Sequence, residues 1–228
     1  RINGLTTPWG LDDLKAAAAA GPDAILVPKV DSGEDIAAIE ALLAEAQAAP
    51  DINIWAMMET PRSVLDPLGI AAASQEFGKR LSCFVMGTND IAKEMRMRHM
   101  PGRANMLGYL ANSVAAARAF DLDVIDGVYN NFKDMEGFDA ECTQGRDLGM
   151  DGKTLIHPSQ VGPCNLAFSP SEVEVEDARA VIDAFALPEN QGKAAISLNG
   201  RMVELLHAEV AKRVVALADA IAERDAAG

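Results

Sequence analysis

The sequence feature that most constrains the fold of this chain is the stretch Asp51–Val64, DINIWAMMETPRSV. Its apolar run predicts a strand buried on both faces, and the run ends in the single acid Glu59. Thr60 can then cap a helix in which Pro61 suits the first turn. A buried strand that passes directly into a helix is typical of parallel α/β folds. The pattern therefore places Glu59 at the carboxyl end of its strand.

A second stretch repeats this pattern, because the apolar run Leu81–Met86 leads into Gly87-Thr88-Asn89-Asp90. Parallel α/β folds bind their ligands where the carboxyl ends of the strands meet, so we expect Glu59 and Asp90 to share one crevice. Two neighbouring carboxylates repel unless a cation lies between them, and their oxygens suit Mg²⁺. The alternative is structural: each acid could cap the next helix or pair with an arginine such as Arg62.

Strand-then-helix units recur along most of the chain, which favours a (β/α) barrel over a sandwich. The predicted strands are residues 23–29, 52–58, 81–86, 122–126 and 151–156. Fewer than eight units are present, and the chain begins at Arg1 in what resembles the end of a strand. We therefore expect a fragment of a TIM (β/α)8 barrel that lacks its amino-terminal part.

The pattern changes after Phe168, which predicts two domains, residues 1–168 and residues 169–228. Ser171 begins a capping-box pattern, and a Gly- and Asn-bearing linker, Pro188–Gly200, precedes a long helix from about Arg201. We expect the first domain to carry the metal site. The second is expected to be a helical extension that serves as a lid or as an oligomer contact.

Charge and cysteine usage exclude several classes of protein. The formal net charge is −14, and no basic stripe offsets it, which argues against a nucleic-acid partner. No apolar run reaches a membrane-spanning length. The odd number of cysteines, three, shows no metal-binding spacing and argues against a disulfide framework. We expect a soluble, cytoplasmic protein.

Other polar residues near predicted strand ends are candidates for the same site. Arg1 and Lys29 could bind a carboxylate, a phosphate or a developing enolate. Lys29 could instead form a Schiff base, which requires burial to lower its pKa, or it could be a solvated rim residue. His157 is a candidate to face the site, and a bond to a loop carbonyl is the alternative.

Six ordered blocks resemble one known family. They are RINGLTTPWG, LVPKVDS, MMETPRSV, GTNDIAKE, DGVYNNFKD and DGKTLIHPSQV. From Arg1 to about Val215 the chain is similar to the citrate lyase β-subunit-like family of CoA-ester lyases, in the HpcH/HpaI-type aldolase superfamily, which includes malyl-CoA lyases and malyl-CoA thioesterases. The resemblance implies a Mg²⁺-dependent TIM barrel, usually trimeric or hexameric, whose first two strands are absent from this chain.

The resemblance also implies roles for individual residues. Glu59 and Asp90 would bind Mg²⁺, and the amides of Gly87–Asn89 would hold a carboxylate. Arg1 would contact the oxygen of a 2-oxo acid or thioester, and Lys29 would help to bind substrate. The expected ligands are a CoA thioester and a small 2-oxo acid of the glyoxylate or oxaloacetate class.

One position departs from the family pattern. Lyases of this family commonly carry an aspartate after the GRMV-type motif, as an acid/base that reaches a neighbouring subunit, and this chain has Glu204 there. A longer carboxylate could still transfer a proton. Its reach would differ from that of aspartate, which adds weight to thioester hydrolysis. From the resemblance as a whole we predict a lyase that cleaves or forms a C–C bond in malyl-CoA or citryl-CoA, with Glu204 as its acid/base. The alternatives are a malyl-CoA thioesterase, a lysine-dependent aldolase through Lys29, and a β-like subunit active only in a complex.

Overall fold

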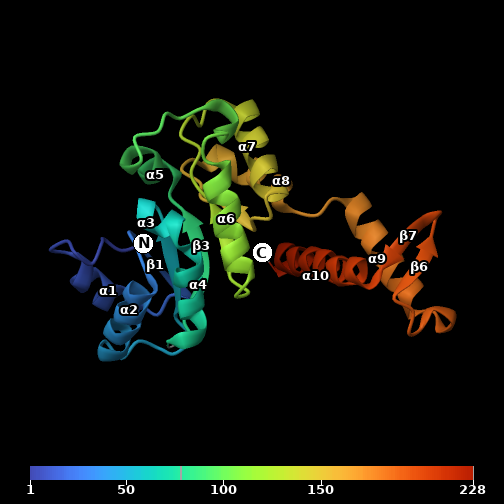
Figure 1. The fold of residues 1–228 in the computed structure, drawn as a ribbon, viewed down its shortest axis with the longest axis horizontal. Coiled ribbons are helices and arrows are strands. Elements are labelled where there is room, and N and C mark those ends of the chain that lie inside the picture. Colours follow the sequence, from blue (N-terminus) through green and yellow to red (C-terminus); the bar gives the residue numbers. More distant parts are fainter. Residues whose placement is uncertain (78, 228) are drawn as a thin grey trace. The chain divides into compact units, whose positions relative to one another are not determined.

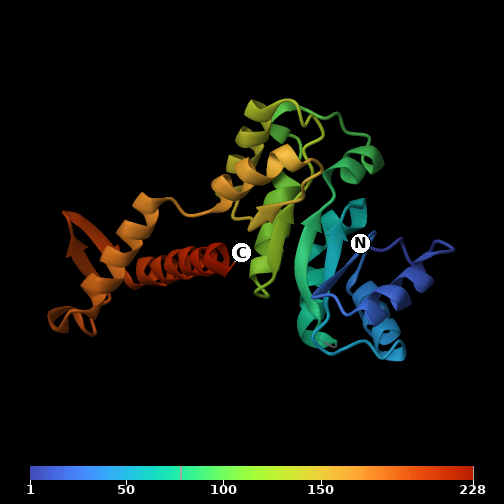
Figure 2. The ribbon, with the colours of Figure 1, turned by 180° about the vertical axis from the view of Figure 1, so that it is seen from behind.

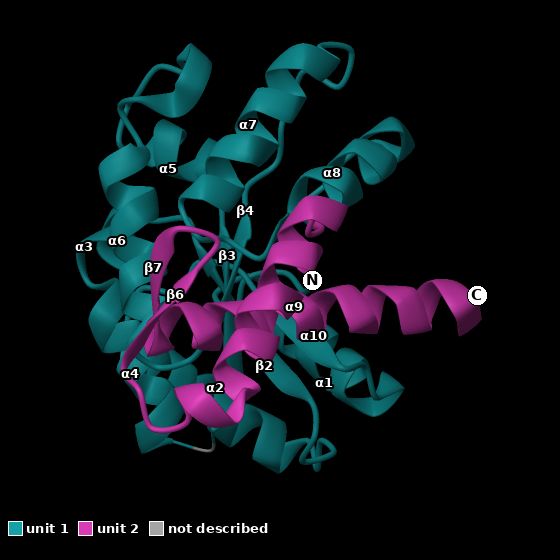
Figure 3. Cartoon of the chain, turned by 90° about the vertical axis from the view of Figure 1, so that its right-hand side faces the viewer, with its two compact units in different colours: residues 1–168 teal, residues 169–228 magenta. Residues whose placement is uncertain are grey.

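The computed structural model describes residues 1–77 and 79–227 of the 228-residue chain. The chain divides into two compact units, unit 1 (Arg1–Phe168) and unit 2 (Ser169–Gly228), which are coloured separately in Figure 3. Each unit has its own hydrophobic cluster and is described by itself. No helix among the described residues is long and apolar enough to cross a membrane.

Within its described residues, unit 1 contains one five-stranded parallel sheet in the order β1-β2-β3-β4-β5. The strands are β1 (Ala24–Val27), β2 (Asn53–Met58), β3 (Leu81–Met86), β4 (Asp123–Asp126) and β5 (Gly152–Lys153). Because neighbouring strands are parallel, their carboxyl ends lie at the same edge of the sheet. The predicted α/β class with a parallel sheet is confirmed.

Helices connect the strands of unit 1. They are α1 (Gly10–Ala20), α2 (Gly33–Glu45), α3 (Pro61–Leu65), α4 (Pro67–Glu76), α5 (Thr88–Glu94), α6 (Leu107–Arg118), α7 (Met135–Asp147) and α8 (Val161–Phe168), with the 3-10 turns η1 (Pro101–Arg103) and η2 (Pro158–Gln160). Helices α2, α4 and α6 pack side by side, and α4 and α6 lie against β3 (Figures 1 and 2). Local signals set the helix starts: Ser32 and Thr60 form capping boxes at α2 and α3.

The main core lies between one face of the sheet and these helices. Ile54 and Phe84 from the strands pack there with Ile39 of α2 and Leu110 of α6, and all four are fully buried or nearly so. Full burial of each such side chain contributes roughly 1.5–3 kcal/mol. This core fixes the strand ends at which the candidate site residues lie.

The opposite face of the sheet is less well covered than the sequence predicts. Leu26, Trp55 and Cys83 lie in register across β1, β2 and β3, and Trp55 is 36% exposed. The prediction that β2 is buried on both faces is therefore wrong at Trp55. The physical reason is the two-residue period of a strand: Ile54 and Ala56 face the helix-covered core, so Trp55 faces the other side.

Strand β5 is shorter than the predicted strand 151–156. Only Gly152 and Lys153 pair with β4. Beyond them, the Ile156 N–H donates a hydrogen bond to the Gln160 side chain, which draws the backbone into the turn before α8. The first residues of the chain lie alongside β1, because the Ile2 N–H donates to the Leu26 carbonyl over 3.2 Å.

Unit 2 contains a hairpin that the sequence analysis treats as a linker. It consists of α9 (Glu172–Ala186), η3 (Pro188–Asn190), β6 (Ala195–Leu198), β7 (Arg201–Glu204) and α10 (Leu205–Ala227). Strands β6 and β7 are antiparallel, and Asn199 and Gly200 between them have φ values of 49° and 81°. Two successive positive φ angles are typical of the tight turns that join antiparallel strands. The predicted linker is therefore wrong, and the last helix begins at Leu205 rather than near Arg201.

Candidate functional site

Two carboxylates meet at the carboxyl edge of the unit 1 sheet. Glu59 directly follows β2 and is only 3% exposed, whereas Asp90 is 39% exposed and lies in the first turn of α5, just after β3. Asp90 therefore lies inside a short helix, α5. Both residues line one cavity of about 360 Å³, together with Arg1, Thr88 and Asn89.

Gly87 allows the backbone before α5 to approach Glu59. A Cβ atom at residue 87 would lie 2.3 Å from the Glu59 Cβ and 2.8 Å from its Oε2. The φ angle of Gly87 is −98°, so any residue could adopt its conformation, and the requirement is one of space. The Gly87 N–H donates to the Met58 carbonyl over 2.9 Å. That amide is already used by the sheet, so the expected carboxylate contact is left to the amides of Thr88 and Asn89.

Lys29 connects the two carboxylates. Its backbone N–H donates to Glu59 Oε1 over 2.9 Å, and its Nζ donates to Asp90 Oδ1 over 2.9 Å. The same Nζ lies 3.6 Å from an oxygen of Glu94, at the end of α5. Lys29 has a φ angle of 58°, which is uncommon for a residue other than glycine. A conformation that is locally unfavourable is thus held where it brings both donors to the site.

The electrostatics of the site favour a bound cation. Burial raises the pKa of Glu59, and the nearby charge of Asp90 raises it further, although Lys29 and Arg1 act in the opposite direction. Burial acts to lower the pKa of Lys29, but its hydrogen bond to Asp90 and the surrounding carboxylates outweigh that effect, and the pKa is raised. A raised pKa favours the ammonium form. This environment disfavours the neutral amine that a Schiff base at Lys29 needs.

The donor set fits a magnesium ion rather than a fully protein-ligated metal centre. Among the described residues, no cluster of three or more His, Cys, Asp and Glu side chains is arranged around a possible metal. Mg²⁺ is commonly held by one or two carboxylates, with water or substrate oxygens in the remaining positions. The pair Glu59 and Asp90, one of them buried with a raised pKa, provides that set.

The cavity wall next to the carboxylates is polar. The amides of Thr88 and Asn89 belong to the first turn of α5, where the helix itself supplies no acceptor. The Asn89 side chain exchanges two hydrogen bonds with Asn130, of 3.0 and 2.7 Å, and so connects the segments after β3 and β4. Arg1 lies on the same cavity wall and is exposed. Asn130 is not among the site residues predicted from the sequence.

Two residues predicted as site candidates, Glu204 and His157, are not among the described residues that line the cavity with Glu59 and Asp90. Glu204 belongs to unit 2, at the end of β7, and its backbone N–H donates to His207 Nδ1 over 2.9 Å. His157 is exposed and caps η2: its Nδ1 accepts from the Ser159 N–H, and its ring stacks on Phe132 with 4.6 Å between centroids. The structure thus gives His157 a local structural role.

A buried ion cluster behind the site is absent from the sequence analysis. Asp126 at the end of β4 accepts from Arg103 Nη1 over 2.7 Å and from Lys153 Nζ over 3.0 Å. Lys153 also contacts Glu141 over 2.7 Å. The side chains of Asp126 and Lys153 are both fully buried. The available sequence signal is an acid at the end of one predicted strand and a lysine within the next.

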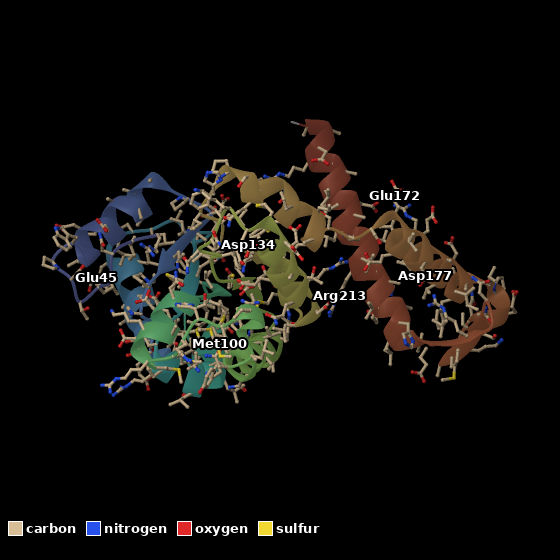
Figure 4. All side chains as sticks on the ribbon, turned by 90° about the horizontal axis from the view of Figure 1, so that it is seen from above. Glu45, Met100, Asp134, Glu172, Asp177 and Arg213 are labelled. Carbon is tan, nitrogen blue, oxygen red and sulfur yellow. The ribbon has the colours of Figure 1, made fainter. Side chains whose placement is uncertain are left out.

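A second cavity lies in unit 1 beside this cluster. It has a volume of about 430 Å³, and Met100 and Asp134, both labelled in Figure 4, line it. It shares Thr88 and Asn89 with the first cavity. Asp134 accepts hydrogen bonds from the Gly137 N–H and from the Tyr129 hydroxyl, so it caps α7.

Known proteins are similar in sequence to this chain over most of its length. A family model described as HpcH/HpaI aldolase/citrate lyase matches residues 1–158. The (3S)-malyl-CoA thioesterase of Cereibacter sphaeroides is 48% identical over 222 residues, which are 97% of this chain and 74% of that protein. The citrate lyase subunit beta of Haemophilus influenzae is 31% identical over 220 residues, 94% of this chain and 74% of that protein.

Solved structures agree with the fold. The CitE protein of Mycobacterium tuberculosis, in complex with magnesium, acetoacetate and coenzyme A, superposes with a TM-score of 0.73 at 26% identity, over 95% of this chain and 77% of that one. A citrate lyase of Burkholderia xenovorans superposes with a TM-score of 0.81 at 18% identity, over 97% of this chain and 72% of that one. The second likeness concerns the fold alone.

Proposed function

This chain belongs to the HpcH/HpaI aldolase/citrate lyase family, and we propose that it is a Mg²⁺-dependent thioesterase that hydrolyses malyl-CoA or a similar 3-hydroxyacyl-CoA. The observation that carries this choice is the 48% identity to a malyl-CoA thioesterase over 97% of the chain. The citrate lyase beta relative is more distant, at 31%. The comparisons therefore support the predicted alternative, a thioesterase, better than the C–C lyase that the sequence analysis ranks first.

The carboxylate pair supports the metal in this proposal. Glu59 and Asp90 would hold Mg²⁺, with oxygens of water and substrate completing its coordination. When bound, the ion would supply Lewis-acid stabilisation of negative charge that develops on a substrate oxygen. Gly87 supports the site by leaving room for the Glu59 carboxylate.

The remaining residues would bind and orient the substrate. The exposed guanidinium of Arg1, on the wall of the cavity, would stabilise the oxygen of the thioester carbonyl as negative charge develops there. The amides of Thr88 and Asn89 would hold the free carboxylate of the malyl group. In the reaction, a water oxygen adds to the thioester carbon and the C–S bond breaks, which releases malate and the CoA thiol. Glu204 stays a prediction as the acid/base.

A C–C lyase is the second candidate, because the citrate lyase beta relative shares most of this chain. Such a reaction would release acetyl-CoA and a small 2-oxo acid such as glyoxylate. Three further properties stay predictions. They are activity only within a larger complex, assembly into a homotrimer or hexamer, and a cytoplasmic location.

The decisive assay follows two products of malyl-CoA separately, with Mg²⁺ present or removed by a chelator. A thioesterase releases free CoA and malate without glyoxylate. Glyoxylate together with acetyl-CoA would contradict hydrolysis and establish the lyase. The absence of any Mg²⁺-dependent product would contradict both and favour a subunit that needs a complex.

Two substitutions test the metal site in the same assay. Glu59→Gln and Asp90→Asn keep the size of each side chain but remove its charge, so each is expected to abolish Mg²⁺-dependent turnover while circular dichroism stays unchanged. Glu45→Gln, at the exposed end of α2, is the matched control and should retain full activity. Full activity in both site variants would rule out the proposed metal site.

A further inference from the structure

We propose that Lys29 sets the affinity of the Glu59 and Asp90 pair for a divalent cation by moving its ammonium group from Asp90 to Glu94 when the cation binds. Lys29 is then a positioning residue with a role in metal loading, beyond binding substrate. The inference rests on the metal site of the proposed function, and it concerns a property of this chain that can be measured without turnover.

The position of Lys29 Nζ is the first observation. It lies 2.9 Å from Asp90 Oδ1 and 3.6 Å from Glu94 Oε1. Asp90 and Glu94 are four residues apart on α5, so their side chains lie on one face, one turn from each other. The two distances differ by 0.7 Å (3.6 − 2.9), so a small displacement of the ammonium along that face exchanges the closer partner.

The backbone of Lys29 is anchored by a hydrogen bond, whereas its side chain is partly exposed to solvent. The residue holds a φ angle of 58°, and its N–H donates to Glu59 Oε1 over 2.9 Å. Its side chain is 41% exposed, and Asp90 and Glu94 are 39% and 41% exposed. The anchor therefore keeps the ammonium within reach of both carboxylates, and the solvent-facing side gives it room to change partner.

Charge explains why a divalent cation would cause the change. Asp90 Oδ1 accepts a hydrogen bond from the ammonium of Lys29, and Asp90 is also one of the two carboxylates that line the cavity. A divalent cation on the same carboxylate repels the ammonium at close range. Glu94 offers the displaced ammonium a second negative partner, so the cation enters without leaving Lys29 unpaired. The ammonium therefore competes with the cation for Asp90.

Lys93 provides a matched control for this argument. Its Nζ lies 3.8 Å from Glu94 and its side chain is 76% exposed. Replacing Lys93 by Met removes the same unit charge from a second lysine whose ammonium lies near Glu94. A general effect of net charge would therefore appear equally in the Lys29→Met and Lys93→Met variants, whereas competition for Asp90 would appear only in the first.

The experiment measures the binding of Mn²⁺, as a paramagnetic probe for the Mg²⁺ site, to the purified chain by electron paramagnetic resonance of the free ion. Lys29→Met should bind Mn²⁺ about tenfold more tightly than the wild type, and Lys93→Met should stay within about twofold of it. Glu94→Gln should bind about threefold more weakly, because Lys29 loses its second partner. In the Lys29→Met background, Glu94→Gln should have a smaller effect.

The outcomes separate this inference from the proposed function. If the wild type binds Mn²⁺ and Asp90→Asn does not, the metal site stands, and equal affinities of Lys29→Met and Lys93→Met would overturn the role of Lys29 alone. Weaker binding by Lys29→Met would overturn it as well. If the wild type binds no Mn²⁺, both proposals fail. Lys29→Gln is a second variant for the case in which the methionine variant does not fold.

Discussion

Gly87 and Glu59 are in such close contact that the space next to the buried carboxylate exists only because residue 87 has no side chain. A Cβ atom there would lie 2.3 Å from the Glu59 Cβ, a distance that real Cβ atoms essentially never show. The contact joins the ends of β2 and β3, which carry the two carboxylates. The geometry of the pair therefore depends on a residue that has no functional group of its own.

Gly87→Ala is expected to weaken Mn²⁺ binding by about tenfold or more, because overpacking of this kind costs about 1–3 kcal/mol and displaces Glu59. Gly108→Ala is the control: it lies in α6 with no atom within 4 Å of an added Cβ. It should leave binding unchanged and stabilise the fold by at most about 1 kcal/mol. Unchanged binding by Gly87→Ala would contradict the role assigned to the contact.

Lys153→Met is expected to destabilise unit 1 by about 3–5 kcal/mol, because only Arg103 then faces the two carboxylates Asp126 and Glu141, and one buried negative charge is left uncompensated. Both tryptophans of the chain lie in unit 1, so tryptophan fluorescence during urea unfolding reports on that unit. The exposed Lys93→Met should change the free energy of unfolding by less than about 1 kcal/mol. Equal effects of the two variants would show that the buried cluster contributes no more to the free energy of unfolding than an exposed lysine does.

The Tyr129 hydroxyl is expected to lose its proton at a higher pH than an ordinary tyrosine. Its hydrogen bond to Asp134, with burial and the Asp134 charge adding to the effect, raises its pKa to about 12 from an ordinary value of 10.0. Because the folded pKa is the higher one, this contribution to stability is fully present below pH 10 and is lost as the pH rises through 12. The difference in ultraviolet absorbance between the wild type and Tyr129→Phe isolates this phenol. A midpoint near pH 10 would contradict the hydrogen bond.

Native thiols are expected to be unreactive. All three cysteines are free and buried, and burial, with smaller contributions from Asp123 and Asp151, raises the pKa of Cys83 to about 12. A bulky thiol reagent at pH 8 should therefore modify none of them in the folded protein, because burial excludes the reagent, and all three in denaturant. Rapid modification of Cys83 in the native state would show that the sheet face carrying Trp55 and Cys83 opens to solvent.

Local signals predict much of unit 1. Apolar runs that end in a polar residue and a helix cap identify the strands, as at Glu59 and Thr60, because both the run and the cap are encoded by neighbours in sequence. The hairpin of unit 2 also had a local signal, the pair Asn199-Gly200, whose positive φ angles suit a tight turn. It was missed because the flanking strands are short and only partly apolar.

The parts of the fold and of the site that the sequence does not predict depend on contacts between residues distant in sequence. The exposure of Trp55 is set by which face the helices cover, and the apolar run alone does not reveal it. The bridge from Lys29 to Asp90 joins residues 61 positions apart. Similarly, Arg103 and Lys153 meet at Asp126 from distant segments. No local pattern distinguishes such ion pairs from solvated charges.

The order of the strands in unit 1 also implies an order in time. Each strand from β1 to β5 pairs with its neighbour in sequence, so every new pairing closes only one strand–helix–strand loop. Short closures cost less chain entropy than long ones and favour rapid folding. During synthesis, β2 can join β1 before β4 has left the ribosome, and the sheet can grow at one edge. The carboxylate pair is then assembled once β3 has joined β2, while the later strands are still to be added.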